Sequence, residues 1–135
     1  MARTYNIKFP LTDNPTTNSF FQMNSITKNS YSSDLLLLLL TQKGERYYES
    51  QYGTNLLKFI FEPNDFLTAS DIEEEIKSTV KLYIPALTIN KVEFKWSTDN
   101  LTGGEVIGEN QLNVIIDFTF QEDSFSEQGS LNISF

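Results

Sequence analysis

The chain has 135 residues, a length typical of one compact domain that can bury a sizeable hydrophobic core. Hydrophobic residues make up 39% of the sequence and charged residues 21%, which is not the composition of a disordered chain. Acidic residues outnumber basic residues by 18 to 10, and the resulting net charge of -8 repels phosphate backbones. We therefore expect a folded protein that does not bind nucleic acid.

The first residues are typical of an extended segment. Tyr5, Ile7 and Phe9 alternate with polar residues up to Pro10, a pattern that predicts a brief edge strand or an extended arm. Residues 12–33 are then crowded with Asn, Ser and Thr, whose side chains favour turns. We interpret residues 1–33 as an N-terminal arm or surface segment and residues 34–135 as one folded domain.

Six consecutive leucines, Leu35 to Leu40, predict a buried helix. A membrane span needs about 20 apolar residues, and the first ten residues of the chain do not resemble a signal peptide, so we expect no membrane partner and no export signal. The helix is expected to begin at Ser32 or Ser33, with a start near Ser25 as the alternative, and to end at Gly44.

Two further helices are predicted after it. Thr54 is expected to cap a short helical stretch that Pro63 ends. Residues 70–83 then begin with the capping-box pattern Ser70-Asp71-Ile72-Glu73, and their apolar residues recur at helical spacing up to Pro85. These patterns place all the predicted helices before the predicted strands.

The last third of the chain alternates apolar and polar residues. The pattern predicts a first strand through Trp96, a bulge near Asn90, a loop at Gly103-Gly104 and two further alternating segments, 112–120 and 131–135. Helices first and strands last predict a single α+β domain, with the helices packed on one face of a small antiparallel sheet.

The sequence offers little for catalysis. It contains no cysteine and no histidine, which removes the thiolate nucleophile, the commonest general base and the preferred ligands of transition metals. It also lacks a glycine-rich phosphate loop and any cluster with metal-ligand spacing. We expect no cofactor, no metal and no enzymatic activity.

The most informative stretch is residues 35–63, where four short motifs occur in register: Leu39-Leu40-Thr41, Gly44-Glu45-Arg46, Gly53 and Phe61-Glu62. Together they resemble the baseplate wedge family of contractile-tail phages, often labelled lysozyme-like, which has relatives in type VI secretion baseplates. With the helix and strands after them, the resemblance covers residues 35–120. It departs from the family at Ser50, where proline is usual, and at Ile84-Pro85-Ala86, where the family has Glu-Pro-Arg.

The resemblance implies a non-enzymatic structural subunit that binds other baseplate wedge proteins. It implies a hetero-oligomer with several copies around a tail axis, located in the virion tail baseplate and assembled in the host cytoplasm. The family's Glu-Pro-Arg helps to dock the wedge, and Pro85 alone is left to keep that turn. The predicted partner-binding residues are Gly44, Glu45, Arg46, Tyr47, Tyr48, Tyr52, Gly53 and Pro85.

The residue types support this site without deciding it. Gly44 can adopt a positive φ, Arg46 presents a planar five-donor fork, and tyrosines are enriched at interfaces. Two interpretations remain open. Either Glu45 and Arg46 contact a partner, or they satisfy caps and ion pairs inside the domain.

The second predicted site is the last strand, which has neither proline nor lysine to protect an edge. Family members resemble part of the tail sheath protein, which implies that this strand accepts a strand from the sheath by β-augmentation. The alternative is that the segment completes the chain's own sheet. The predicted sheath-facing residues are Leu131, Asn132, Ile133, Ser134 and Phe135.

Two other functions stay open as alternatives. One is a peptidoglycan-degrading, lysozyme-like glycosidase, for which Glu45, Glu49 and Glu62 are the candidate carboxylates. The other is a soluble adaptor domain unrelated to tails, which explains the composition but not the motifs in register.

Overall fold

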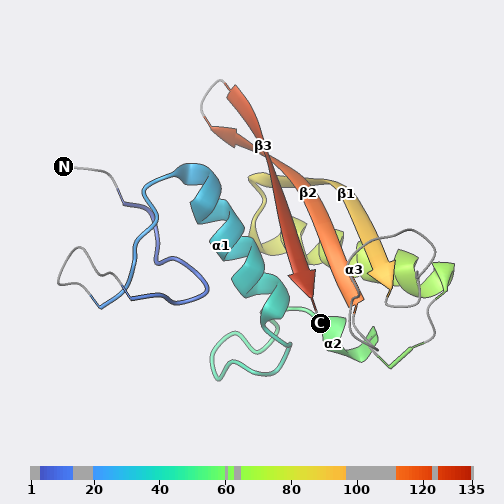
Figure 1. Ribbon diagram of the computed structural model, residues 1–135. Helices are drawn as coiled ribbons and strands as arrows, with labels where there is room; N and C mark the ends of the chain where they lie inside the picture. The colour runs from blue at the N-terminus through green and yellow to red at the C-terminus, as the bar shows by residue number, and fades with distance from the viewer. Residues whose placement is uncertain are drawn as a thin grey trace.

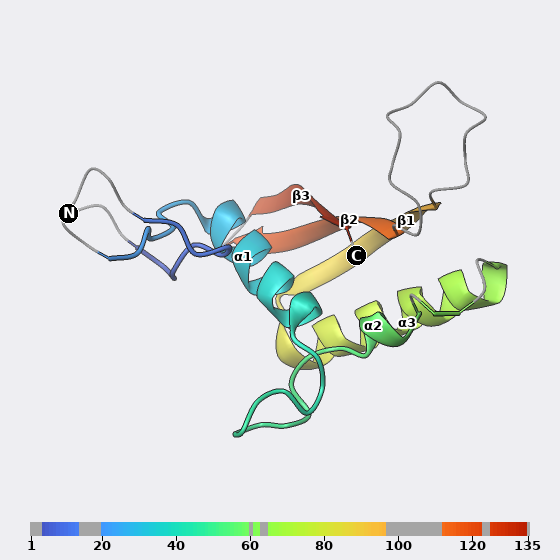
Figure 2. The same cartoon turned by 60° about the horizontal axis from the view of Figure 1, so that its bottom comes forward.

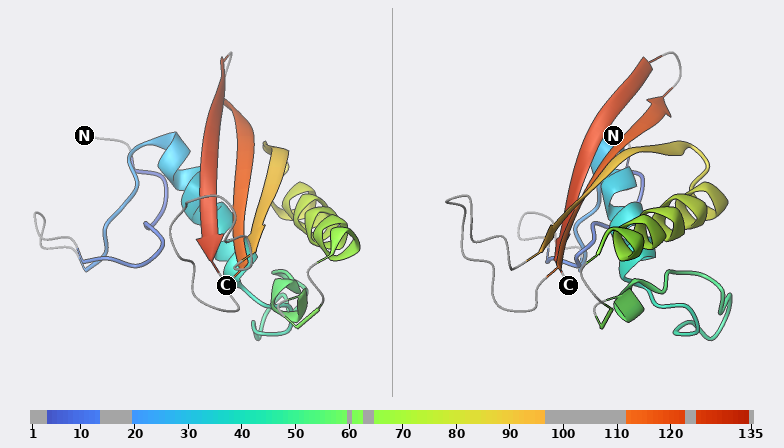
Figure 3. Two further views of the ribbon diagram at one scale, coloured as in Figure 1. Left: turned by 45° about the vertical axis from the view of Figure 1, so that its right-hand side comes forward. Right: turned by 90° about the vertical axis from the view of Figure 1, so that its right-hand side faces the viewer.

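The computed structural model describes residues 4–13, 20–59, 61–62, 65–96, 112–122 and 125–134. Three helices come first in the chain: α1 (Thr27–Leu40), α2 (Leu56–Phe59) and α3 (Phe66–Tyr83). Three strands come after them: β1 (Leu87–Trp96), β2 (Leu112–Glu122) and β3 (Phe125–Ser134). Figure 1 shows the strands side by side, and Figure 3 shows α1 and α3 on the same side of the sheet. The predicted α+β architecture is therefore confirmed.

The sheet is antiparallel throughout, in the order β1-β2-β3, so β2 is its central strand. The register between β1 and β2 shifts between Ile89 and Lys91, which confirms the predicted bulge near Asn90. β3 begins at Phe125 and is longer than the predicted segment. The prediction missed residues 125–130 because they lack alternating apolar side chains. The predicted Gly103-Gly104 loop lies outside the described residues.

The hydrophobic core lies between the two long helices and the sheet. Alternate residues of β2 are fully buried against the helices: Val114, Ile116, Phe118 and Phe120. The core-facing side chains of the helices are Leu35, Leu38, Leu39, Ile72, Ile76 and Val80. Each such side chain contributes about 1.5–3 kcal/mol when it leaves water. The leucine run is not buried all round, because Leu40 is 41% exposed.

The start preferred for α1 and the start predicted for α3 were wrong, whereas the alternative start for α1 near Ser25 is confirmed. α1 begins at Thr27, near the alternative start, so Ser32 and Ser33 lie inside it. The Ile26 cap makes no side-chain hydrogen bond. α3 begins at Phe66, where the Asp65 carboxylate accepts a 2.8 Å hydrogen bond from the amide of Thr68 and takes the capping role predicted for Ser70. The predicted end is right, since α3 stops at Tyr83, two residues before Pro85.

Two other predicted helix signals act in a loop instead. α1 ends at Leu40, before Gly44, and Gly44 (φ +90°) lies in the turn after the helix. The Thr54 hydroxyl donates a 2.8 Å hydrogen bond to the carbonyl oxygen of Leu39, so it ties the loop to the end of α1 and does not cap α2.

Residues 4–13 and 20–25 form an extended N-terminal arm, and these two stretches pair with each other beside α1 (Figure 1). An isolated bridge pairs Ile7 with Met23, and the amide of Tyr5 donates to the carbonyl oxygen of Asn24. This pairing is an isolated bridge and not a strand of the sheet. None of the helices in the described residues has the length and apolar character needed to cross a membrane.

Candidate partner-binding site

Most predicted site residues lie in one loop, residues 41–54, between α1 and α2. Figure 2 shows this 41–54 loop projecting beyond the end of α1, beside the C-terminal end of α3. Its base is closed by backbone hydrogen bonds from the Thr54 amide to the Thr41 oxygen (2.8 Å) and from the Lys43 amide to the Thr54 oxygen (3.1 Å). A third bond joins the Gly44 amide to the Ser50 oxygen at 2.6 Å. The loop is therefore held in shape by its own backbone.

The two glycines of the family motif have backbone roles. Gly44 (φ +90°) and Gly53 (φ +114°) both adopt the left-handed region that disfavours other residues. Gly53 is also crowded, because a Cβ atom there would overlap the carbonyl oxygen of Thr41. A Cβ on Gly44 would meet nothing within 4 Å. Gly53 thus permits the close approach that closes the loop base.

Arg46 lies on an aromatic row that links the loop to α3. Its guanidinium carbon is 3.7 Å from the centre of the Tyr52 ring, a cation–π geometry. The Tyr52 ring meets the Tyr83 ring edge-on, with centroids 5.0 Å apart. Partial burial raises the pKa of the Tyr52 hydroxyl, although Arg46 acts in the opposite direction. Tyr83 leads directly to Pro85, so the row connects both parts of the predicted site.

The remaining motif residues divide into local and exposed side chains. The Glu45 carboxylate accepts a 3.1 Å hydrogen bond from the Gln42 amide, so it caps the turn of its own loop. Tyr47 and Tyr48 lie at the loop tip, 93% and 81% exposed, with their rings edge-on at 5.1 Å. Within the described residues Arg46 forms no ion pair, and its donors remain available around the Tyr52 ring.

A carboxylate that the sequence did not single out anchors the base of the 41–54 loop. Glu75 on α3 accepts hydrogen bonds from the Lys43 ammonium (2.8 Å) and from the Asn55 amide (3.2 Å). Partial burial acts to raise the pKa of Glu75, but these two bonds together with the positive charges of Lys43 and Lys58 outweigh it and hold the pKa below its ordinary value. The contact therefore stabilises the fold near neutral pH and is lost as the pH falls through that lowered pKa.

Pro85 lines a separate groove, with a volume of about 330 Å³, between the C-terminal half of α3 and the start of β1. Lys77 and Lys81 line the same groove. Two cationic side chains therefore lie beside Pro85. At this position the family has Glu-Pro-Arg, and this sequence lacks both of those charges. The helical spacing of the two lysines was visible in the sequence, but their place beside Pro85 was not.

The second predicted site, β3, lies at the margin of the sheet. Its inner edge pairs with β2 from Asn113↔Ser134 to Glu122↔Phe125. No strand of the described residues pairs with its outer edge. The segment therefore completes the chain's own sheet and also leaves one edge open. Phe135 lies outside the described residues.

The carboxylates considered for a glycosidase lie on the surface of the described part of the chain. Glu45, Glu49 and Glu62 are all exposed, and Glu45 is occupied by the Gln42 amide. The described residues also contain no group of three or more carboxylates that could hold a metal ion.

Comparison with known proteins agrees with the motifs of the 41–54 loop. The sequence model of the family described as "Baseplate wedge protein gp25" matches residues 27–124, which is most of the chain. The chain belongs to this family. The resemblance of the motifs is thereby confirmed, and the chain is a baseplate wedge protein of a contractile, phage-like tail system.

One curated relative matches part of this wedge family protein. The baseplate wedge protein gp25 of Enterobacteria phage T4 is 33% identical over 63 residues, which is 47% of this chain and 48% of the relative. The match thus spans about half the length of that curated relative.

Two solved structures share the fold. One is a putative tail lysozyme from Geobacter sulfurreducens (TM-score 0.61, 19% identity, covering 84% of this chain and 94% of that one). The other is a chain of the anti-feeding prophage baseplate (TM-score 0.60, 16% identity, covering 93% and 81%).

Proposed function

We propose that this wedge protein binds other baseplate wedge proteins through the 41–54 loop and the adjoining Pro85 turn. The observation that carries the proposal is the row from Arg46 through Tyr52 to Tyr83, beside the exposed ring pair of Tyr47 and Tyr48. Arginine and tyrosine are the residue types enriched at the energetic centres of interfaces. Because the loop is closed by its own backbone, it presents these side chains without a large ordering cost.

The aromatic row also explains how Arg46 would reach a partner. Tyr52 supports one face of the guanidinium, which leaves its edge donors free for the carboxylates or carbonyl oxygens of a neighbour. Glu45 is part of the site as a turn-forming residue, not as a direct contact. Lys81 offers positive charge beside Pro85 for the same partner surface, whereas the Lys77 ammonium is paired with Glu73.

Replacing Arg46 with alanine is expected to weaken binding to the other wedge proteins of the same baseplate at least about tenfold. Only the cation–π contact is lost inside the domain, so the free energy of unfolding should change by about 1 kcal/mol or less. Co-purification and binding titration measure the first effect, and urea unfolding the second. Lys95→Ala, a charge change on the opposite face of the sheet, is the matched control. Unchanged binding by Arg46→Ala would remove the loop from the interface.

A second surface of the protein, the outer edge of β3, is proposed to accept a strand from the tail sheath protein. The two sheet margins differ in a way that favours β3. β1 comes directly after Pro85 and carries a bulge together with Lys91 and Lys95, all features that discourage pairing at an edge. The described part of β3 has no proline, no lysine and no bulge.

Proline scanning tests the β3 edge. Along an edge strand, successive amides point alternately to the neighbouring strand and to solvent, so one of Ser130→Pro and Leu131→Pro removes an outward donor while the other breaks a bond to β2. The better-folded variant, identified by thermal unfolding, should fail to start sheath polymerisation, as seen by electron microscopy. Normal polymerisation on that variant would show that the sheath attaches elsewhere.

A further inference from the structure

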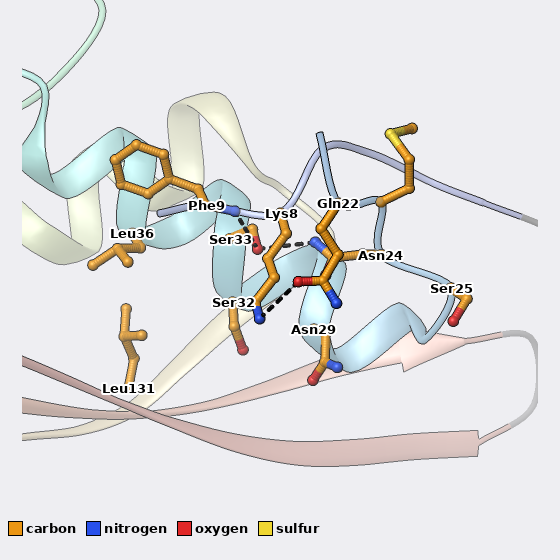
Figure 4. A pocket seen from close by; sticks show the side chains of 11 residues that line it. Lys8, Phe9, Gln22, Asn24, Ser25, Asn29, Ser32, Ser33, Leu36 and Leu131 are labelled. Atoms are coloured by element: carbon orange, nitrogen blue, oxygen red, sulfur yellow. Dashed lines mark hydrogen bonds between the residues drawn. The ribbon is translucent and has the colours of Figure 1, made fainter. Parts of the chain in front are cut away.

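A cavity of about 330 Å³ lies between the N-terminal arm, α1 and β3 (Figure 4). Three segments that are distant in the sequence line it. The arm contributes Lys8, Phe9 and Gln22, α1 contributes Asn29, Ser32 and Leu36, and β3 contributes Leu131. Because β3 is a marginal strand, the cavity lies along the edge that no described strand covers.

The cavity is apolar at one end and polar at the other. Leu36 and Leu131 point toward each other across it in Figure 4, and both are half-buried, as is Phe9. Ser32 and Asn29, about one and two helical turns before Leu36, line the other end. The Lys8 ammonium donates a 3.3 Å hydrogen bond to the Gln22 side chain above this polar end.

The arm that forms one wall is fixed by a buried polar network. The Asn24 side chain, 5% exposed, donates hydrogen bonds to the Ser33 hydroxyl and the Asn6 side chain, both at 2.9 Å. The Phe9 amide donates to the same Ser33 hydroxyl at 3.2 Å, and Asn6 donates to Asp34 at 2.7 Å. The cavity is therefore a preformed feature of the fold, since its wall is attached to α1 by several polar contacts.

We propose that this cavity is a side-chain subsite of the β3 edge, which takes an apolar side chain from the sheath strand added there. The inference rests on the proposed β-augmentation of β3. An added strand would lie about 4.8 Å from β3, and every second side chain would point toward α1 and the arm. The side chain beside Leu131 then enters the apolar end, between Leu36 and Phe9.

The geometry of the two walls also predicts the next inward residue of the added strand. Successive side chains on one face of a strand are about 6.8 Å apart, and four residues of helix rise about 6 Å. On the added strand, the inward side chain two positions from the apolar one therefore lies at the end of the cavity lined by Asn29 and Ser32. We infer a strand that carries a Leu, Ile or Val and, two positions away, a small polar residue. The wall formed by the arm makes the N-terminal segment part of the sheath-binding site.

Filling the cavity without altering β3 tests the inference. Ser32→Trp places a bulky ring in it, and Ser78→Trp on the outer surface of α3 is a matched control. Both serines are helical, and each hydroxyl donates to a backbone oxygen of its own helix, Lys28 for Ser32 and Glu75 for Ser78. Ser32→Trp should weaken binding of the sheath protein at least about tenfold and leave binding to wedge proteins unchanged. Ser78→Trp should bind the sheath protein as tightly as the unsubstituted protein does.

Asn29→Trp, an exposed position on the same wall, repeats the test if Ser32→Trp folds poorly. Normal sheath binding by the filled variants, combined with failure of the folded β3 proline variant, would overturn the subsite and leave β-augmentation standing. Normal binding by both kinds of variant would overturn both proposals. A dimer of the unsubstituted protein that Ser32→Trp dissociates, measured by light scattering, would assign the cavity to a second copy and overturn the sheath assignment.

Discussion

Replacing Gly53 with alanine is expected to lower the free energy of unfolding by about 2–4 kcal/mol, the largest effect we predict for the 41–54 loop. Two costs combine. Alanine is strained at φ +114°, and its Cβ would overlap the Thr41 carbonyl oxygen and lie 2.9 Å from the Thr41 carbonyl carbon. That oxygen accepts the Thr54 amide, so relief of the clash requires the loop base to open. Urea unfolding measures the loss directly.

Gly44→Ala is the matched control, because Gly44 also has a positive φ but no crowding. It should cost about 1–2 kcal/mol from backbone strain alone. The variant Gly53→Ala should also weaken binding to wedge proteins, since the opened base no longer positions Arg46. Equal losses of stability in the two variants would contradict the role assigned to the Thr41 contact.

The sequence located this loop but not the contacts that shape it. The four motifs in register from Leu39 to Glu62 together pointed to the family and to the segment. The continuation of the Arg46–Tyr52 pair onto α3 was not visible, because Tyr52 and Tyr83 are 31 positions apart in the sequence and meet only when α3 packs beside the loop. Glu75 was hidden for the same reason. It is one of several acids on α3, and only the fold aligns it with Lys43 and Asn55.

The fold class was predictable because apolar periodicity reports which face of an element is buried. The residues at which the helices start were less predictable. At α1 the first turns are polar. The Ser33 hydroxyl and the Ser30 carbonyl oxygen accept hydrogen bonds from Asn24 and Asn6 of the N-terminal arm, and the apolar pattern begins only after the helix does. At α3 the residues Phe66 and Leu67 are exposed although apolar, which hid the Asp65 cap. β3 was cut short because Gly129 stands where an inward apolar side chain was expected.

That glycine leads to the second large effect. Gly129 pairs with Phe118 of β2, and a Cβ on Gly129 would lie 2.5 Å and 2.7 Å from two atoms of the Phe118 ring. Phe118 is fully buried, so its ring cannot move into solvent. We expect Gly129→Ala to lower the free energy of unfolding by about 1–3 kcal/mol through overpacking. This outweighs the gain of about 0.5–1 kcal/mol that alanine brings to a strand in place of glycine.

A double-mutant cycle with Phe118→Leu separates these terms. The smaller leucine side chain makes room for the new methyl group, so Gly129→Ala should cost less in the Phe118→Leu background, with a coupling energy of about 0.5–3 kcal/mol. Ser130→Ala, the next residue but on the exposed face of β3, should change stability by no more than about 0.5 kcal/mol. Additive losses in the cycle would show that the Phe118 ring does not require glycine opposite it. A confirmed coupling would explain why this edge strand, which is proposed to receive the sheath, keeps a residue that otherwise weakens strands.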